Sequence, residues 1–588
     1  MSVTNHNSKT SHATPSPAIY PSWRFGDLPA SELIPKLQQY LTAQKPEKHW
    51  QLVWLNNDDR PVIGLLPKVA WSVCFNSNQQ GSLYTVTKNY RDDNGTTTSK
   101  PMSYSAWQDE LITYSQNQRK NQDPDNNIAP NIKIDADKKS SKSVNTHDAQ
   151  PIYHHGFIGF IGYDIAAHEL SPTADIQFAK QPCAVLGHYD IYLTPADENA
   201  GWTLRTINPD TINLDKREQD TTELDAIKLD THHQTRDALL DTLISCLNAL
   251  DHALSNKIEA PQNTEYLLSP LVLNPRWHED AYQSAFHKTQ DYLQQGDCYQ
   301  INLTQVWQGL LVTDTVNHTP NLIDYSPALH RNTQAPFAGY LQTKFFNNDI
   351  DAIKTDTSKS QFELLSCSPE LFFTFKKDAS TGQHHIVTKP IKGTMPRGTT
   401  AEQDDFNKQQ LINSEKDRAE NVMIVDLLRN DLGKYAKIGS VKAPQLFAIE
   451  SFSNVHHMVS TITAELKSDA HPLAVLFGSL PAGSITGTPK KRAVEIISEL
   501  ESESRGAYCG TMGYMNFDGS GQWNVLIRTL QANTSSNGTL DDTLGKEGQV
   551  SLWAGGGITV ASDCDAEYQE CLDKVGNLLS VLTLPQKY

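Results

Sequence analysis

Two pairs of carboxylates in the second half of this 588-residue sequence have the spacing of a single helix face. Asp417 and Glu420 form the first pair, and Glu567 and Glu570 form the second. Residues three apart lie side by side on a helix surface. Oxygen ligands from two such faces suit a hard divalent cation, and magnesium is commonly held by one or two carboxylates together with substrate and water. We therefore predict a magnesium site to which these four side chains contribute.

Each carboxylate pair also has an interpretation that needs no metal. The helix dipole favours acidic residues in a first turn, so Asp417 and Glu420 would then be solvated side chains. Glu570 lies four residues before Lys574, a spacing at which opposite charges commonly pair on a helix surface. The sequence leaves these alternatives open.

One lysine has neighbours that are unusual for a surface side chain. Lys392 lies between Ile391 and Gly393 in TKPIKGTMPRG, just after a strand-like run. This context predicts a partly buried amine, and burial lowers the pKa of a lysine from its usual value of about 10.4. A neutral amine is a nucleophile, so Lys392 is a candidate for covalent catalysis. A solvated lysine in a turn is the alternative.

Three further segments carry groups that can bind an anion or a hydroxyl. The loop GSITG at 483–487 leads into a helix with Thr488 as its predicted N-cap, and the amides there could bind a carboxylate or serve only as a cap. Arg528 is predicted on the apolar face of a strand, where its guanidinium needs a carboxylate from the protein or from a ligand. His457 lies in a strand-like run, as a core histidine or as a catalytic hydrogen-bonding group.

The helices that position the carboxylates are predicted from their capping residues. The segment 413–434 begins with Ser414 as N-cap and ends near Gly433. The segment 553–582 contains a strand, three glycines and a helix capped near Ser562 or Asp563. The predicted core face of that second helix consists of Leu572, Val575 and Leu579.

Elsewhere the sequence alternates between strand-like and helical patterns, which predicts an α/β (α+β) fold. Two strands are expected around the turn DGSG within 507–532, and a packing helix is expected at about 235–257. Residues 1–18 have the composition of a disordered tail. Three polar stretches are predicted surface insertions: 116–150, 209–233 and 532–548.

Composition excludes several classes of function. The chain has 68 acidic and 50 basic residues and a formal charge of -18, which opposes binding to nucleic acid or to an anionic membrane. Neither a secretory signal nor a membrane-spanning apolar run is recognisable. Eight scattered cysteines without a CxxC pair suggest reduced thiols, so we expect a cytoplasmic protein.

Taken together, these segments resemble the chorismate-utilising enzymes, the family of anthranilate, aminodeoxychorismate, isochorismate and salicylate synthases. The likeness also includes SPELFF (368–373) and GDCYQINLTQ (296–305), and it covers residues 270–585. It implies a catalytic domain there, preceded by an N-terminal region at 19–265. It also implies two large packed antiparallel sheets with outer helices.

The resemblance further implies a role for each candidate residue. Glu420 and Glu570 would bind Mg²⁺ directly, and Asp417 and Glu567 would act on it through water. Glu370 would be the general acid, with His457 hydrogen-bonding the departing hydroxyl. The groups that would bind the substrate are Arg528, Tyr508, Ser484, Gly555, Gly556 and Gly557.

The position of Lys392 distinguishes members of the family. This chain has PIKGT there and so resembles the 4-amino enzymes, whereas anthranilate synthases typically have PIAGT. The resemblance thus implies the aminodeoxychorismate synthase component I reaction of para-aminobenzoate and folate biosynthesis, with a covalent intermediate on Lys392. The alternatives are anthranilate synthase component I and a non-catalytic regulatory subunit that binds chorismate. No glutaminase motif GxCxGH is present, so ammonia is expected from a separate glutamine amidotransferase subunit.

Overall fold

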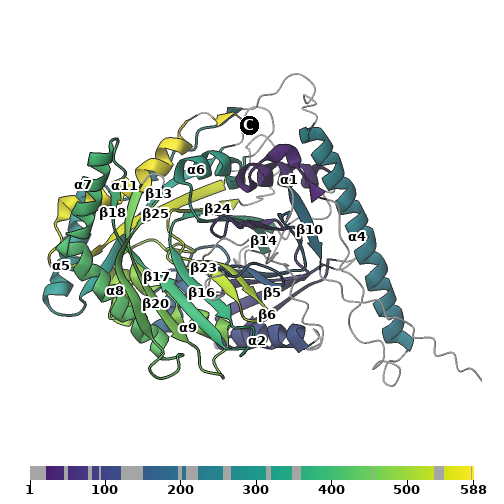
Figure 1. Ribbon diagram of the computed structural model, residues 1–588, viewed down its shortest axis with the longest axis horizontal. Coiled ribbons are helices and arrows are strands. Elements are labelled where there is room, and N and C mark those ends of the chain that lie inside the picture. The colour runs from purple at the N-terminus through teal and green to yellow at the C-terminus, as the bar shows by residue number, and fades with distance from the viewer. Residues whose placement is uncertain are drawn as a thin grey trace, which may run out of the picture.

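The structure is a computed structural model in which two large antiparallel sheets pack together, with helices on the outside (Figure 1). The predicted α+β architecture is therefore confirmed. The predicted tail lies outside the described residues, as do most of the three predicted insertions. The structure describes residues 22–44, 51–76, 83–91, 95–120, 150–196, 201–206, 223–255, 267–312, 320–346, 359–452, 455–534, 548–584 and 586–587.

The first sheet contains 12 strands within the described residues, all paired antiparallel. In spatial order they are β1 (Ser22–Trp23), β10 (Trp202–Thr206), β9 (Ile191–Pro195), β3 (Val62–Gly64), β2 (Val53–Leu55), β14 (Phe337–Phe346), β15 (Lys359–Ser368), β24 (Thr529–Thr534), β25 (Gly548–Ile558), β13 (Gln300–Leu311) and β12 (Asn274–Pro275), with β21 (Gly487–Thr488) also pairing β13.

The second sheet also contains 12 strands within that part of the chain. In spatial order they are β18 (Ile391–Pro396), β20 (Val455–Glu465), β17 (His384–Lys389), β16 (Leu371–Lys377), β23 (Gly521–Asn524), β22 (Thr511–Asn516), β7 (Gly156–Ile161), β8 (Ala184–Tyr189), β4 (Val69–Phe75), β5 (Tyr84–Tyr90) and β6 (Thr97–Met102), with β19 (Lys442–Ser451) also pairing β20. A two-stranded sheet joins β11 (Leu267–Leu268) to β26 (Gln586–Lys587).

Helices cover both outer faces of the paired sheets and gather at one end, on the left of Figure 1. At that end α5, α7, α8 and α11 surround β13, β18 and β25. The α-helices are α1 (Ala30–Gln44), α2 (Tyr104–Lys120), α3 (Tyr163–Leu170), α4 (Glu223–Ser255), α5 (Glu279–Gln294), α6 (Ser326–Thr333), α7 (Ala401–Ile412), α8 (Glu415–Gly433), α9 (Pro472–Ser479), α10 (Lys490–Leu500) and α11 (Cys564–Leu582). Within the described residues, no helix is both long and apolar enough to cross a membrane.

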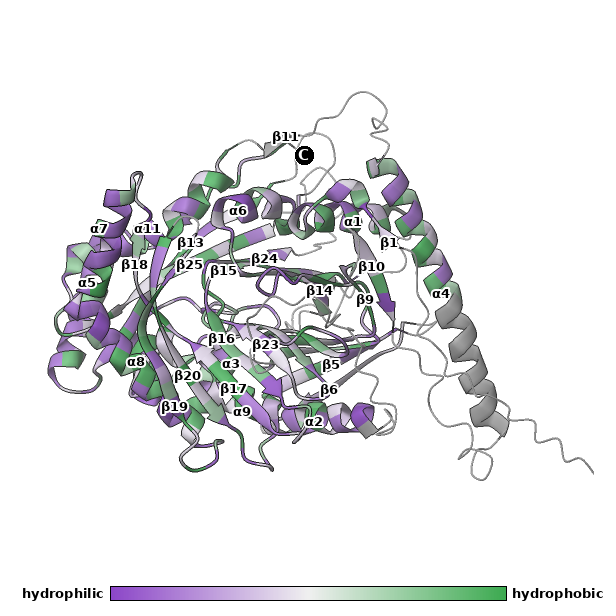
Figure 2. Cartoon of the chain, in the orientation of Figure 1, coloured by the Kyte–Doolittle hydropathy of each residue, from purple (hydrophilic) through white to green (hydrophobic). Residues whose placement is uncertain are grey.

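The strand β7 illustrates how the sheets are held together. Its sequence GFIGFI is buried throughout. Ile158 and Phe160 belong to the core between the two sheets, whereas Phe157 and Ile161 belong to the core beneath the helices. Successive side chains of a strand point to opposite faces, so one apolar run contributes to two cores. Hydrophobic residues accordingly concentrate in the strands, while α5 and α7 are largely hydrophilic (Figure 2).

Most predicted elements are confirmed, with differences at their ends. The expected helix at 235–257 is part of the longer α4, which begins at Glu223 and so includes the end of the predicted insertion 209–233. Likewise α2 continues to Lys120, past the predicted start of the insertion 116–150. The two strands around DGSG are β22 and β23.

Two predicted helix details are wrong by one residue. The N-cap of α10 is Pro489 rather than Thr488, because Thr488 pairs with Gln300 in the first sheet. In α11 the predicted core positions Leu572 and Leu579 are only partly buried, since the face that packs on β25 is shifted by one position along the helix. The buried apolar residues there are Cys571, Val575, Leu578 and Leu582.

Candidate functional site

The start of α8 directs one of its carboxylates toward the second sheet. The Ser414 hydroxyl accepts a hydrogen bond from the Asp417 backbone N–H at 3.2 Å, so the predicted N-cap is confirmed. One turn further on, Glu420 is buried on the face of the helix that carries Ile424 and Val425. Burial of that apolar face orients the Glu420 carboxylate inward, where it meets β18.

Lys392 lies on β18 opposite that carboxylate. Its Nζ is 3.1 Å from Glu420 Oε2, and the side chains are 17% and 11% exposed. The prediction of a partly buried amine is therefore confirmed. The next residue, Gly393, has φ +86°, and a Cβ there would lie 2.9 Å from Asp417 Cγ. Glycine at 393 thus permits both the left-handed turn and the close approach of Asp417.

Glu370 is a buried carboxyl group next to Lys392. It precedes β16, and it accepts hydrogen bonds from the Ser484 hydroxyl and from the backbone N–H of Ile391. Burial raises the pKa of the Glu370 carboxyl to about 7, although the charge of Lys392 and the bond from Ser484 act in the opposite direction. Near neutral pH this carboxyl can therefore hold a proton and donate it.

Arg528 lies near enough to Glu370 for the two charges to interact, and its charge also acts on His457. The prediction that Arg528 lies on a strand is wrong. Arg528 lies in the link before β24 with φ +52°, because the strand pairing begins only at Thr529. Burial lowers the pKa of its guanidinium, and the charge of Glu370 opposes this. No protein carboxylate within the described ranges forms a salt bridge with Arg528, which leaves the guanidinium able to bind an anionic ligand.

His457 lies on β20, as predicted for a strand-like run. Its Nδ1 is 2.8 Å from the Thr394 hydroxyl, two residues beyond Lys392 on β18. Burial, reinforced by the charge of Arg528, lowers the pKa of the imidazole to about 4. At neutral pH His457 is therefore an uncharged hydrogen-bonding group.

Two of the three consecutive glycines of β25, Gly556 and Gly557, lie between Lys392 and Glu567 of α11. Here the glycines belong to the strand itself, where Gly555, Gly556 and Gly557 pair with β13. A Cβ on Gly556 would lie 2.9 Å from Glu567 Oε2. A Cβ on Gly557 would clash with Gln300 Nε2 and would lie 3.2 Å from Lys392 Nζ. Side chains at Gly556 and Gly557 would fill the site, whereas one at Gly555 would meet Thr304 of β13.

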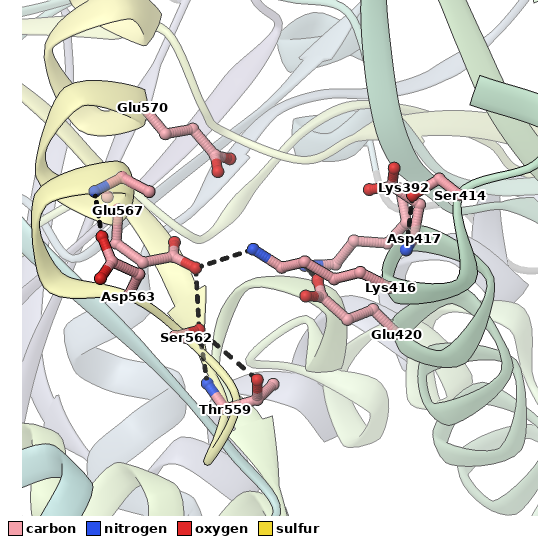
Figure 3. Close-up of polar contacts among 12 residues, drawn as sticks. Lys392, Ser414, Lys416, Asp417, Glu420, Thr559, Ser562, Asp563, Glu567 and Glu570 are labelled. Carbon is pink, nitrogen blue, oxygen red and sulfur yellow. Dashed lines mark hydrogen bonds and ion pairs between the residues drawn. The ribbon is translucent and has the colours of Figure 1, made fainter. Parts of the chain in front are cut away.

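The first turn of α11 supplies the second carboxylate pair. Asp563 caps the helix, because its side chain accepts a hydrogen bond from the Ala566 N–H. Of the two predicted caps, Ser562 and Asp563, the structure therefore has Asp563. Glu567 is almost fully buried and faces α8, whereas Glu570 is half exposed (Figure 3). Glu570 pairs with Lys574 at 2.8 Å, so the ion pair considered as an alternative from the sequence is present.

Two residues missed by the sequence reasoning contact this pair. Ser562 Oγ donates to Glu567 Oε1 at 2.8 Å, and Lys416 Nζ reaches the same oxygen from α8 at 3.1 Å (Figure 3). The sequence signal that could have placed Lys416 at the site is that acidic residues flank it on both sides. A third missed residue is Gln300 of β13, which is buried beside Gly557 with both side-chain polar atoms unbonded in the described structure.

The fold thus brings most of the predicted site residues into one region. Tyr508 lies apart from this set of contacts, because its buried ring packs against Trp553 and Arg505. The carboxylates face one another from two helices, yet no three His, Cys, Asp or Glu side chains within the described residues are close enough to hold a metal ion by themselves. A cation bound here would need oxygen atoms from water or substrate as well, as magnesium generally does.

Comparison with known proteins identifies the family. A family model described as "chorismate binding enzyme" matches residues 89–580. Aminodeoxychorismate synthase component 1 of Klebsiella aerogenes is 41% identical over 303 residues, and the protein of that name from Escherichia coli (strain K12) is 40% identical over 312 residues. Each alignment covers 52% of this chain and 58% of the relative.

A solved structure supports the fold independently. Anthranilate synthase component I from Streptococcus pneumoniae TIGR4 superposes with a TM-score of 0.55 at 22% identity, covering 88% of this chain and 91% of that one. At this level of identity the likeness concerns the architecture alone. Since the family model spans most of the sequence, including every candidate site residue, the chain belongs to the chorismate binding enzyme family.

Proposed function

We propose that this protein converts chorismate and ammonia to 4-amino-4-deoxychorismate, the reaction for which its relatives are named. The observation that carries the proposal is the position of Lys392. Its amine is partly buried and pairs with Glu420, and its charge acts on the buried carboxyl of Glu370, whose pKa is about 7. A nucleophile beside a proton donor is the arrangement that displacement of a hydroxyl requires.

In the proposed first step the Lys392 ammonium that pairs with Glu420 loses a proton to solvent, and the free amine attacks C2 of chorismate. The electron pairs of the ring diene shift toward C4, and the C4 hydroxyl departs as water after it takes a proton from Glu370. Hydroxide is a poor leaving group, so this proton transfer is essential to the step. His457, uncharged at neutral pH, would hydrogen-bond the departing hydroxyl.

In the proposed second step ammonia attacks C4, and the electron shift runs back through the ring. The bond between C2 and Lys392 Nζ breaks, the lysine leaves as the free amine, and Glu370 takes up a proton from the incoming nitrogen. Two displacements thus place nitrogen at C4 and restore the enzyme. The enolpyruvyl group is retained throughout.

Chorismate carries two carboxylates, and local groups must offset the net charge of -18. We assign the enolpyruvyl carboxylate to the Arg528 guanidinium and the β25 glycine backbone, with Ser484 beside Glu370. Tyr508 was assigned to the same carboxylate by resemblance. Its packing against Trp553 lends that assignment no further support.

The residues present fit a magnesium ion at the ring carboxylate. Glu420 and Glu567 each pair with an ammonium group, which supports a cation-binding role for their carboxylates. Glu420 and Glu570 would hold the metal directly, while Asp417 and Glu567 would act through its water. When bound, Mg²⁺ would supply positive charge to neutralise the ring carboxylate.

We further propose that ammonia comes from a separate glutaminase subunit. The relatives are named as a component 1, which supports a partner component, and no glutaminase motif is recognisable in the sequence. The eight free thiols support a cytoplasmic location. If the isolated chain hydrolysed glutamine as fast as it aminates chorismate, the separate subunit would be excluded.

A product assay tests the proposed function. Purified protein is incubated with chorismate, MgCl₂ and ammonium chloride at pH 8, and the products are separated by chromatography with mass detection. We expect 4-amino-4-deoxychorismate, with its enolpyruvyl group intact. Release of pyruvate with fluorescent anthranilate would instead identify an anthranilate synthase, and a folded protein without turnover would indicate a regulatory subunit.

The pKa of Glu370 predicts how the rate depends on pH. Because its burial raises the pKa to about 7, the proton that the acid must donate is present below pH 7 and lost as the pH rises through that value. We expect kcat/KM to show an alkaline limb near pH 7. In Glu370→Gln the rate should fall about 10²- to 10⁴-fold, and the residual activity should lack that limb. An unchanged limb in the variant would assign the titration to another group.

The lining role of β25 predicts that a single methyl group blocks the site. In Gly557→Ala the added Cβ would meet Gln300 Nε2 and Lys392 Nζ, so chorismate binding should weaken about 10-fold or more, by crowding rather than unfolding. Equilibrium binding of chorismate and the thermal midpoint should be measured together. Gly576→Ala on α11 is the matched control, because a Cβ there meets no atom within 4 Å. Wild-type binding by Gly557→Ala would remove β25 from the site.

A further inference from the structure

Three lysines pair one-to-one with carboxylates of the proposed metal site. Lys392 pairs with Glu420 at 3.1 Å, Lys416 with Glu567 at 3.1 Å, and Lys574 with Glu570 at 2.8 Å. Lys392 has a proposed chemical role, and Lys574 lies on the same helix as its partner and also donates to the Gly555 carbonyl at 2.8 Å. Lys416 has neither a role in the proposed mechanism nor a second hydrogen bond of the kind that holds Lys574 to β25.

The Lys416 pair differs from the others because it joins two helices. Lys416 reaches from the first turn of α8 to the first turn of α11, 151 residues further along the chain (Figure 3). Its side chain is 52% exposed, whereas that of Glu567 is 3% exposed. The carboxylate is also held by the Ser562 hydroxyl. The ammonium can therefore move into solvent, while the carboxylate stays in place.

From this asymmetry we propose that Lys416 is a built-in counter-ion that competes with the divalent cation for the Glu567 carboxylate, and so sets how tightly the site binds metal. The inference rests on the proposed function only in placing the cation near Glu567. A cation whose water shell uses Glu567 must displace the ammonium, and the two positive charges also repel each other. Loading the metal then requires Lys416 to swing away from α11.

Direct binding of Mn²⁺ to the full chain tests the competition without using activity. The free ion is followed by electron paramagnetic resonance, and Mg²⁺ is titrated as a competitor. We expect Lys416→Met to lower the dissociation constant about three- to tenfold, because the half-exposed ammonium no longer competes with the cation for Glu567. When a chelator removes divalent cations, the same variant should have a lower thermal midpoint than the wild type. Saturating Mg²⁺ should raise the midpoint of the variant by more than it raises that of the wild type.

Lys434→Met is the matched control for the change in net charge. Lys434 follows the last residue of α8, is 56% exposed, and shares its partner Asp431 with Lys490. It lies about 27 Å from Lys416 along the helix axis, at 1.5 Å per residue. This variant should bind Mn²⁺ like the wild type, and so should Lys416→Arg, which keeps the charge.

A double-mutant cycle separates displacement from a general field effect. In a Glu567→Gln background the carboxylate is gone, so Lys416→Met should no longer tighten Mn²⁺ binding. Persistence of the full effect in that background would overturn the competition, as would equal or weaker binding by Lys416→Met alone. In both cases normal Mn²⁺ binding by the wild type would leave the proposed metal site standing. If the wild type bound no Mn²⁺ at millimolar concentration, both the metal site and this inference would fall.

Discussion

Replacing Lys392 with alanine is expected to abolish amination of chorismate, with a loss of about 10⁴-fold or more in kcat, as for other enzymes that lose their nucleophile. The physical reason is that ammonia alone would have to displace the C4 hydroxyl without a covalent intermediate. Binding of chorismate should change little, because Arg528 and the proposed metal hold its carboxylates. The affinity is measured by calorimetry and the rate by the product assay.

The same variant tests the covalent intermediate directly. When ammonia is withheld, intact-mass spectrometry of wild-type protein with chorismate and MgCl₂ should show an increment equal to chorismate minus water. The adduct is a secondary amine rather than an imine, so borohydride should not increase its yield. Lys392→Ala should show no increment, and peptide mapping of the wild type should place it on Lys392.

Lys389→Ala is the matched control for Lys392→Ala. Lys389 ends β17, the strand that precedes β18 in the chain, and pairs with Glu450; both side chains are about one third exposed. It should keep both the adduct and the rate. An adduct mapped to any other residue, or normal production of 4-amino-4-deoxychorismate by Lys392→Ala, would remove Lys392 from the mechanism.

Replacing Glu420 with alanine is the second change with a large expected effect. Glu420 is a proposed metal ligand and the partner of Lys392, so its removal should weaken Mg²⁺ binding about 100-fold or more and eliminate activity at ordinary magnesium concentrations. Glu570→Ala should act similarly. Glu567→Ala should mainly weaken the apparent affinity, about 10- to 100-fold, because it contacts the metal only through water.

Titrations of MgCl₂, read both as activity and as the rise in thermal midpoint, measure these effects. Glu415→Ala is the control on α8, since Glu415 is an exposed residue of the same first turn. If Glu420→Ala and Glu570→Ala both kept the magnesium dependence of the wild type, the two-helix metal site would be wrong.

The sequence determined those features that depend on neighbouring residues along the chain. Ser414 was identified as a helix cap, and the second cap was narrowed to Ser562 or Asp563, because capping is a contact between a side chain and an amide three residues away. The carboxylate pairs and the partly buried Lys392 followed from helical spacing and from apolar flanking residues. Resemblance to a family then assigned the chemistry, which periodicity and charge had left open.

Only the tertiary structure decided how distant segments meet. β2 pairs with β14 and β7 with β22, so each sheet combines strands from the first 200 residues with strands from the second half of the chain. Lys416 reaches Glu567 across 151 residues, and Arg528 adopts a left-handed conformation where two strands separate. Such contacts arise when buried faces of whole sheets and helices pack together. The free energy of that packing is shared by many residues, so no local pattern around Lys416 or Arg528 encodes it.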